Sequence, residues 1–175
     1  MSRAAMSMSS GAAAARRTGR CCACVIVDPN RNMVVGRGVD TTHLHPLGHA
    51  VMNAIDDVAA WQIETWYPES KGCVHRKEGG KSHVERRGKV DPEIDGEMGD
   101  GTPPYLCTSY DCYTLNEPCA MCAMALVHSR LRRIVYAFET GGGRGMLSST
   151  TDGCRRLHAC RSLNHHFVVY HMGCS

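Results

Sequence analysis

Aromatic residues are scarce in this sequence, and long apolar segments are absent from it. Phenylalanine and tryptophan occur only twice each among 175 residues, so a hydrophobic core has to be built from aliphatic side chains, methionine and cysteine. The apolar runs fall far short of the roughly 20 residues that a membrane-spanning helix needs. The N-terminal residues also lack the apolar centre of a secretory signal. These absences argue against a membrane protein and against a secreted one.

Cysteine, in contrast, is abundant. The sequence has 11 cysteines and 10 methionines. A secreted, disulfide-rich protein is usually shorter and poorer in methionine, and its cysteines are usually even in number. The composition therefore favours a reducing compartment, and the length suits one compact domain.

Two segments show no sustained periodicity. Residues 1–20 contain alanine, serine and arginine but no acid, and we interpret them as an unstructured leader. Within residues 62–104, seven basic residues between 71 and 89 are followed by five acidic ones up to residue 100. Adjacent blocks of opposite charge are typical of a solvated loop, although a contact between the basic block and nucleic acid stays open. We predict one domain at 21–175 with a long surface insertion at 62–104.

The remaining sequence alternates between strand-like and helical patterns. It predicts these elements in chain order: strands at Cys21–Asp28 and Asn32–Val39, a helix at His49–Trp61, a strand at Tyr105–Tyr113, a helix at Cys119–Arg130, and strands at Arg133–Phe138 and Asn164–Tyr170. The turn residues Pro29 and Asn30 make the first two strands a hairpin. The pattern predicts an α/β fold in which helices cover a sheet.

Two short segments contain side chains that bind metals. One is His49-Ala50-Val51 and the other is Pro118-Cys119-Ala120-Met121-Cys122, each at the start of a predicted helix. Backbone N–H groups and the helix dipole favour thiolates at such a position, and the thiolate is the form of cysteine that binds zinc. One histidine and two cysteines leave the fourth position of a tetrahedral ion open, as in catalytic zinc sites. The sequence therefore predicts a zinc site at His49, Cys119 and Cys122.

Other interpretations of these residues stay open. The two cysteines also fit a redox dithiol or a pair of buried small side chains. His43 and His45 lie close to His49 in the sequence and have the same ligand chemistry. Cys174, near the end of the chain, is an alternative to water as the fourth ligand.

The two segments resemble the signature of the zinc-dependent deaminases, in which His-x-Glu precedes Pro-Cys-x-x-Cys. Together, HPLGHAV and YLCTSYDCYTLNEPCAMCAMALVHSRLRRIVYAF resemble the catalytically silent subunits of the eukaryotic tRNA wobble-adenosine deaminases, and LNHHF near the C-terminal end is similar as well. The resemblance extends over roughly Cys21 to Tyr170, apart from the insertion.

This resemblance implies a three-layer fold of the cytidine-deaminase type, with a mixed central sheet covered by helices. It implies that His49, Cys119 and Cys122 bind Zn²⁺, and it places Val51 where active members have the catalytic glutamate. Valine has no proton to transfer. The nearest acids are Asp40, which corresponds to an asparagine that contacts the base, and Glu117, which we interpret as structural.

The expected function is that of a non-catalytic zinc-binding subunit. It would form a heterodimer with a glutamate-containing paralogue, act on tRNA in the nucleus and cytoplasm, and support conversion of adenosine to inosine at the wobble position. Two alternatives stay open: an active zinc-dependent deaminase that uses another acid, and a purely structural zinc protein. Family members usually continue into a terminal helix, and the silent subunits carry an N-terminal RNA-binding region, so we expect a longer native protein.

The predicted helix Cys119–Arg130 is apolar on nearly every side, which is typical of a buried helix. Its alanines and methionines suit packing against a helix of a related subunit, and we place Met124 and Val127 in that interface. A core helix of a monomer is the alternative. Three arginines at its end either line a path for RNA or merely solvate the surface: Arg130, Arg132 and Arg133.

Overall fold

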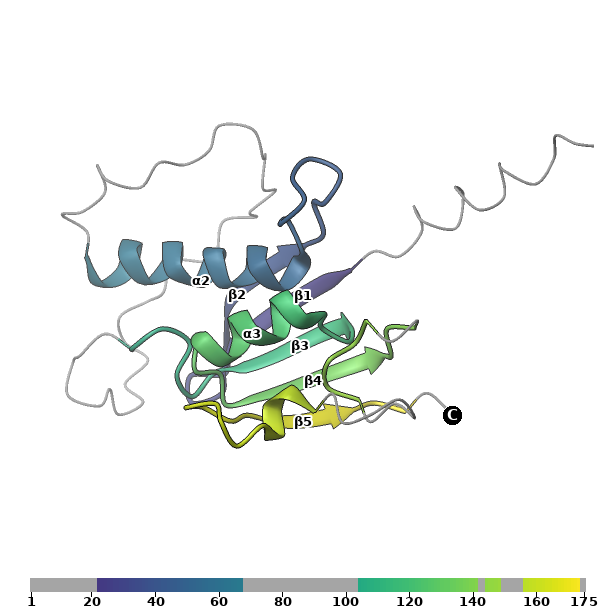
Figure 1. The fold of residues 1–175 in the computed structure, drawn as a ribbon. Helices are drawn as coiled ribbons and strands as arrows, with labels where there is room; N and C mark the ends of the chain where they lie inside the picture. The colour runs from purple at the N-terminus through teal and green to yellow at the C-terminus, as the bar shows by residue number, and fades with distance from the viewer. Residues whose placement is uncertain (1–21, 68–103, 142–143, 149–155, 174–175) are drawn as a thin grey trace, which may run out of the picture.

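The structure is a computed structural model, and it describes residues 22–67, 104–141, 144–148 and 156–173 (Figure 1). The predicted leader and nearly all of the predicted insertion lie outside these ranges. No helix among the described residues is long and apolar enough to cross a membrane.

Five strands form one sheet in the spatial order β2-β1-β3-β4-β5. The strands are β1 (Ala23–Asp28), β2 (Met33–Val39), β3 (Asp111–Asn116), β4 (Arg133–Phe138) and β5 (Val168–His171). β1 pairs antiparallel with β2 and with β3, whereas β3, β4 and β5 run parallel. The expected mixed sheet is therefore confirmed. Because β3, β4 and β5 are parallel, their C-terminal ends point the same way.

Two helices lie side by side on one face of the sheet (Figure 1). They are α2 (Ala50–Trp66) and α3 (Ala120–His128), and a short 3-10 turn, η2 (Leu157–Ala159), contacts α3. α2 packs so closely on β2 that a Cβ atom at Gly38 would overlap the carbonyl oxygen of Ala50. Glycine at this position therefore lets the first turn of α2 approach the sheet.

The hydrophobic core lies between the helices and the sheet. Ile26, Val35 and Ile134 from the strands and Ala54 and Leu126 from the helices are fully inaccessible to solvent. On the opposite face of the sheet, within the described residues, no helix covers the strands, and Tyr113 and Tyr170 are 41% and 51% exposed. The described helices thus form one of the two outer layers that the family resemblance implies.

Several element boundaries differ from the prediction. α2 continues to Trp66, so the predicted start of the insertion at residue 62 lies inside a helix. The predicted strand at Tyr105–Tyr113 is mostly a turn, because Leu106 and Ser109 adopt positive φ angles of 54° and 70° that interrupt extended backbone.

Two other elements, α3 and β5, are shorter than predicted. α3 ends at His128, and β5 begins at Val168 rather than at Asn164. The hairpin and β4 match the predicted elements closely.

Candidate metal centre

His49 is the N-cap residue of α2, and the loop before it is closed by hydrogen bonds. The Thr41 N–H and hydroxyl both donate to the carbonyl oxygen of Gly48, at 2.6 and 3.2 Å. From α2, the side-chain amide of Asn53 donates to the Val39 carbonyl at 2.7 Å and to the Thr41 hydroxyl at 2.9 Å. These bonds hold the β2–α2 connection in one shape and fix the position of His49.

The two cysteines lie in the first turn of α3, which follows the C-terminal end of β3. Cys119 is the N-cap residue, and Cys122, three residues later, is buried. Cys119 forms a backbone bridge with Gly145, and the Met146 N–H donates to the Pro118 carbonyl at 3.2 Å. The loop after β4 therefore packs against the N-terminus of α3 and holds this turn in place.

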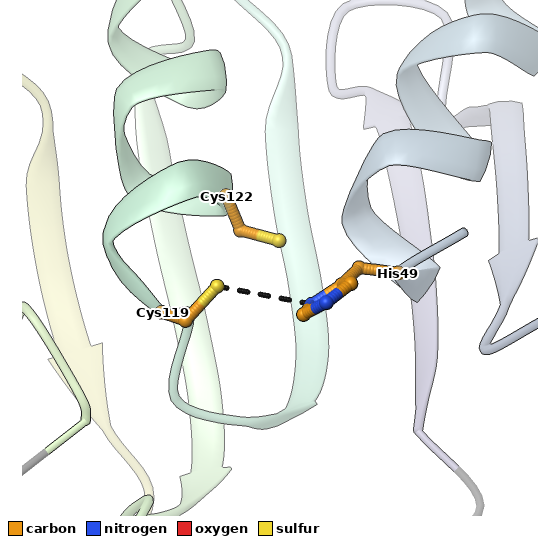
Figure 2. A group of neighbouring side chains, drawn as sticks. All are labelled: His49, Cys119 and Cys122. Atoms are coloured by element: carbon orange, nitrogen blue, oxygen red, sulfur yellow. Dashed lines mark hydrogen bonds between the residues drawn. The ribbon is translucent and has the colours of Figure 1, made fainter. Parts of the chain in front are cut away.

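These three side chains point toward one another from the starts of two helices (Figure 2). The Cys119 Sγ atom lies 3.7 Å from the His49 Nδ1 atom, and the ligand atoms of His49, Cys119 and Cys122 all lie within 4.8 Å of one another. A tetrahedral zinc ion, with bonds of about 2.3 Å to sulfur and about 2.0 Å to nitrogen, separates its ligand atoms by roughly 3.5–3.8 Å. A small contraction of this cluster is enough to hold the ion.

The pKa values of the two thiols are shifted in opposite directions. The pKa of Cys119 is lowered to about 5, chiefly by a hydrogen bond from the Cys122 thiol. Burial opposes this shift, and the backbone amides of Cys122 and Met121 and the nearby His49 add to it. The same hydrogen bond, with burial, raises the pKa of Cys122. The pair therefore holds one proton near neutral pH, and a bound metal would displace it.

Val51 lies in the first turn of α2, two residues after His49. Its side chain is only 4% exposed and belongs to the hydrophobic core. The resemblance to the zinc-deaminase signature led us to expect Val51 at the position of the glutamate that moves protons in active members. At this place the chain has a buried hydrocarbon, which neither accepts nor donates a proton.

Glu117 is the acid nearest to the cysteine motif, and its carboxylate contacts a different part of the chain. One oxygen accepts from the backbone N–H groups of Leu147 and Ser148 at 2.7 and 2.6 Å. The other accepts from the Thr140 N–H at 3.2 Å and the Ser148 hydroxyl at 3.1 Å. With 3% exposure and four donors, Glu117 holds the loop after β4, which confirms the structural role expected for it.

Asp40 is the other nearby acid. Its carboxylate accepts from the Thr42 N–H at 3.0 Å and from the Thr42 hydroxyl at 2.6 Å, so it caps the turn at the start of the loop. Its charge contributes to the raised pKa of Cys122. Neither acid joins the metal-ligand cluster, which contains no carboxylate among the described residues.

The structure discriminates among the ligands that the sequence left open. His43 and His45 are exposed on the loop, and His45 accepts a hydrogen bond from the Leu47 N–H at 3.2 Å, so His49 alone joins the cysteines. Cys174 lies outside the described residues. No sequence pattern indicated the role of Asn53, because its partners belong to the loop and to β2.

Comparison with known proteins places the fold and motif in one family. The sequence profile described as "Cytidine and deoxycytidylate deaminase zinc-binding region" matches residues 1–138. This chain belongs to that family. Its mixed sheet with helices agrees with the α/β fold expected from the motifs.

Curated relatives have similar sequences over most of the chain. One is the human "Probable inactive tRNA-specific adenosine deaminase-like protein 3", 39% identical over 164 residues that cover 90% of this chain and 43% of the human protein. Another is "tRNA-specific adenosine deaminase TAD3" of Arabidopsis thaliana, 36% identical over 141 residues, or 72% of this chain and 33% of that protein. The chain thus spans less than half of the length of each of these two relatives.

One solved structure has a similar fold. It is described as "Biochemical and Structural Studies of A-to-I Editing by tRNA:A34 Deaminases at the Wobble Position of Transfer RNA", and it superposes with a TM-score of 0.52 at 20% identity. The match covers 91% of this chain and 88% of the other. At this level of identity the likeness concerns the fold.

Proposed function

We propose that this chain is a non-catalytic, zinc-binding subunit of a heterodimeric tRNA adenosine deaminase that converts adenosine to inosine at the wobble position. His49, Cys119 and Cys122 would hold Zn²⁺. The names of the human and Arabidopsis relatives support the tRNA substrate, and the word "inactive" in the human name supports the missing catalysis.

The observation on which this proposal rests is Val51. In a zinc deaminase, metal-bound water attacks the base, and the signature glutamate moves protons to the ring and to the departing ammonia. General acid–base groups of this kind typically contribute 10² to 10⁴-fold to a rate. A buried valine contributes none of this.

An active deaminase with another acid is the first alternative. The structure offers two neighbouring carboxylates, and both have other partners: Glu117 accepts four hydrogen bonds from the loop after β4, and Asp40 accepts two from Thr42. Releasing Glu117 would leave buried N–H groups of Leu147 and Ser148 without acceptors, which is costly. This supports a subunit without catalysis of its own.

A zinc site without catalysis still has a structural use. His49 begins α2 and Cys119 begins α3, so one ion would join two helices whose first residues are 70 positions apart. Because such a site is not preformed in the unfolded chain, the free energy of metal binding adds to the free energy of folding. We propose that zinc here fixes the relative position of the two helices.

The partner would be a paralogue that retains His-x-Glu, and α3 offers a surface for it. Cys122, Ala123, Leu126 and Val127 face the protein's own core, whereas Met121, Met124 and Ala125 are half-buried. The expected interface residue Val127 is only 2% exposed, so that expectation is wrong. The core helix of a monomer would be buried on all sides, whereas α3 has a half-buried face.

On α2, Met52 and Ile55 are half-buried apolar residues that pack against the same core. Adaptable methionines and small alanines suit a helix-to-helix contact between related subunits. We propose that the heterodimer forms through Met121, Met124 and Ala125 of α3 together with these two residues.

Isolation of the endogenous chain from cells of its source tests the proposal. Copurification of a His-x-Glu paralogue and of tRNA is the expected result. A purely structural zinc protein, the second alternative, would copurify with neither. We also propose that the chain works in the nucleus and cytoplasm, which immunofluorescence of the endogenous protein would test.

A further inference from the structure

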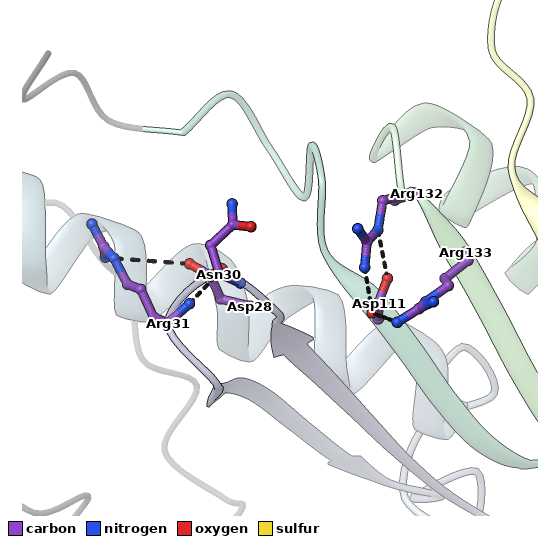
Figure 3. Close-up of polar contacts among 6 residues, drawn as sticks. All are labelled: Asp28, Asn30, Arg31, Asp111, Arg132 and Arg133. Carbon is purple, nitrogen blue, oxygen red and sulfur yellow. Dashed lines mark hydrogen bonds and ion pairs between the residues drawn. The ribbon is translucent and has the colours of Figure 1, made fainter. Parts of the chain in front are cut away.

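Asp111, the first residue of β3, is a buried carboxylate with two arginine partners. It is 1% exposed. Arg132 Nε and Nη2 donate to its two oxygens at 2.9 and 2.8 Å, and Arg133 Nη2 lies 2.6 Å from Oδ2 (Figure 3). Burial alone would raise the pKa of Asp111, but the hydrogen bonds from Arg132 and Arg133 outweigh it and lower the pKa. The carboxylate therefore holds two guanidinium groups in defined orientations.

The charges in this cluster do not balance. One carboxylate faces two guanidiniums, so one positive charge is left over. A nearby cluster in the same view is balanced among the described residues, where Asp28 pairs with one arginine, Arg31, at 3.9 Å (Figure 3). Asp28 also caps the β1–β2 turn by accepting from the Asn30 N–H at 2.9 Å, so its role in the fold is accounted for.

The two guanidiniums also remain open to solvent. The side chains of Arg132 and Arg133 are 45% and 37% exposed. The Arg132 guanidinium donates two of its five N–H groups to Asp111, so three N–H groups are not used there. The unused donors of an oriented arginine can bind the oxygens of a phosphate.

A third arginine lies beside this pair. Arg130 is exposed, adopts a positive φ of 57°, and places its guanidinium 5.8 Å from the ring centre of Tyr105. Tyr105 is 66% exposed, so an aromatic ring is open to solvent next to the Arg130 guanidinium. Arginine beside an exposed aromatic ring is a combination that binds single-stranded RNA by contacting phosphates and stacking bases.

The two chain segments beside Arg132 and Arg133 contain no acid. Residues 129–138 and 156–173 are joined here, because the Val168 N–H donates to the Arg132 carbonyl at 3.1 Å and His165 Nε2 lies 2.7 Å from the Leu131 carbonyl oxygen. Residues 129–138, which contain the three arginines, have neither aspartate nor glutamate. Residues 129–138 therefore bring only positive charge to this end of the sheet, which favours a polyanionic ligand.

We propose that Arg130, Arg132, Arg133 and Tyr105, here called the arginine surface, bind the phosphate backbone of RNA, with Asp111 orienting two of the arginines. α3 separates this surface from the metal centre by about 13 Å, from its nine residues at 1.5 Å each. The surface thus contacts the RNA backbone away from this chain's own metal centre and positions the RNA. This inference rests on the proposed function only for the choice of tRNA as the RNA ligand.

The test measures binding of a fluorescent tRNA transcript to the full-length chain by anisotropy between 0.05 and 0.3 M salt. Replacing Arg130 and Arg132 with glutamine should weaken binding roughly tenfold and flatten the salt dependence by about 1.4 to 1.8 in log–log slope, for two lost phosphate contacts. Arg37→Gln removes an exposed arginine from β2 and is the matched control for Arg130→Gln. It should leave both quantities unchanged.

Asp111→Asn separates orientation from charge. The variant gains a positive charge but loses the anchor of both guanidiniums, so the proposal expects weaker RNA binding, with melting curves confirming that the variant is folded. Tighter or unchanged binding would show that Asp111 does not orient the surface. Arg133 still neutralises Asp111 in Arg132→Gln. Arg130 has no carboxylate partner in the part of the chain that the structure describes, so Arg130→Gln alone provides a readout if the double variant is unstable.

Two other results would overturn the inference. Equal losses in Arg130→Gln and Arg37→Gln would indicate nonspecific charge attraction. Displacement of the tRNA by polyglutamate of equal charge would indicate an acidic protein partner instead of RNA. Failure to assemble with a paralogue, with the arginine dependence intact, would refute the proposed function and leave this inference standing.

Discussion

The Sγ atom of Cys119 lies 3.7 Å from Nδ1 of His49, although 70 residues separate them in the sequence. Each is the N-cap residue of a helix, and neither forms a capping hydrogen bond through its side chain. Residues that commonly cap helices are Ser, Thr, Asp and Asn. A histidine at one cap and a cysteine at the other are better explained by a shared metal than by helix stability.

Metal content tests this explanation first. The purified chain should contain one zinc per molecule, and Cys119→Ala with Cys122→Ala should remove it and lower the melting temperature by at least about 10 °C. Elemental analysis and thermal unfolding measure both effects. The buried Cys107→Ala is the control, and it should retain zinc. Full zinc occupancy in the double variant would exclude this site.

Met124 and Val127 lie on the same helix but should respond differently to glutamate. Met124→Glu places a charge on the half-buried face, so the chain should fold and bind its paralogue at least about tenfold more weakly. Val127→Glu places it in the core, where exposure is 2%, so it should destabilise the fold by several kcal/mol.

Pull-down and thermal unfolding distinguish the two effects. Leu115→Glu, on the opposite face of the sheet, is the control and should leave the complex intact. If Met124→Glu binds the paralogue as tightly as the wild type, the interface is elsewhere.

Glu117 should matter for the loop after β4. Glu117→Gln replaces an acceptor oxygen with an NH₂ group that opposes N–H donors, which should cost about 2–4 kcal/mol of unfolding free energy. Hydrogen exchange should become faster at the Leu147 and Ser148 amides, because both donate to the Glu117 carboxylate in the wild type. Glu139→Gln, at an exposed acid nearby, should change stability by less than about 0.5 kcal/mol. Unchanged amide protection in Glu117→Gln would refute this role.

Asp111 should make stability depend on acid pH. Its arginine partners lower its pKa in the folded chain, so its contribution is complete above the ordinary value of 3.8 and is lost as pH falls through the folded value. Wild-type unfolding free energy should therefore fall more steeply below about pH 4 than that of Asp111→Asn. Urea titrations over this range measure it, with the exposed Asp56→Asn as control. Parallel curves for wild type and Asp111→Asn would contradict the ion-pair assignment.

The metal cluster could be anticipated from sequence because its signals are local. A histidine at one helix start and Pro-Cys-x-x-Cys at another specify ligand chemistry without knowledge of the fold. The contacts of Glu117 could not be anticipated in the same way, because its partners lie 23 to 31 residues downstream in a segment without periodicity.

Packing decided what sequence patterns left ambiguous. α3 is apolar at nearly every position, so the pattern does not separate Val127 in the core from Met124 near the surface. The turn at Tyr105–Ser109 resembled a strand, since positive φ angles at Leu106 and Ser109 leave little trace in residues other than glycine.

The most direct test of the central claim is inosine formation at the tRNA wobble position by three preparations: this chain alone, its His-x-Glu paralogue alone, and the coexpressed complex. The complex should form inosine, and this chain alone should be at least about 10²-fold slower, because the proposed function places Val51 where active members have the glutamate that transfers protons. Mutation of the paralogue's glutamate should abolish the activity of the complex. Inosine formation by this chain alone, lost in Cys119→Ala with Cys122→Ala, would contradict the claim.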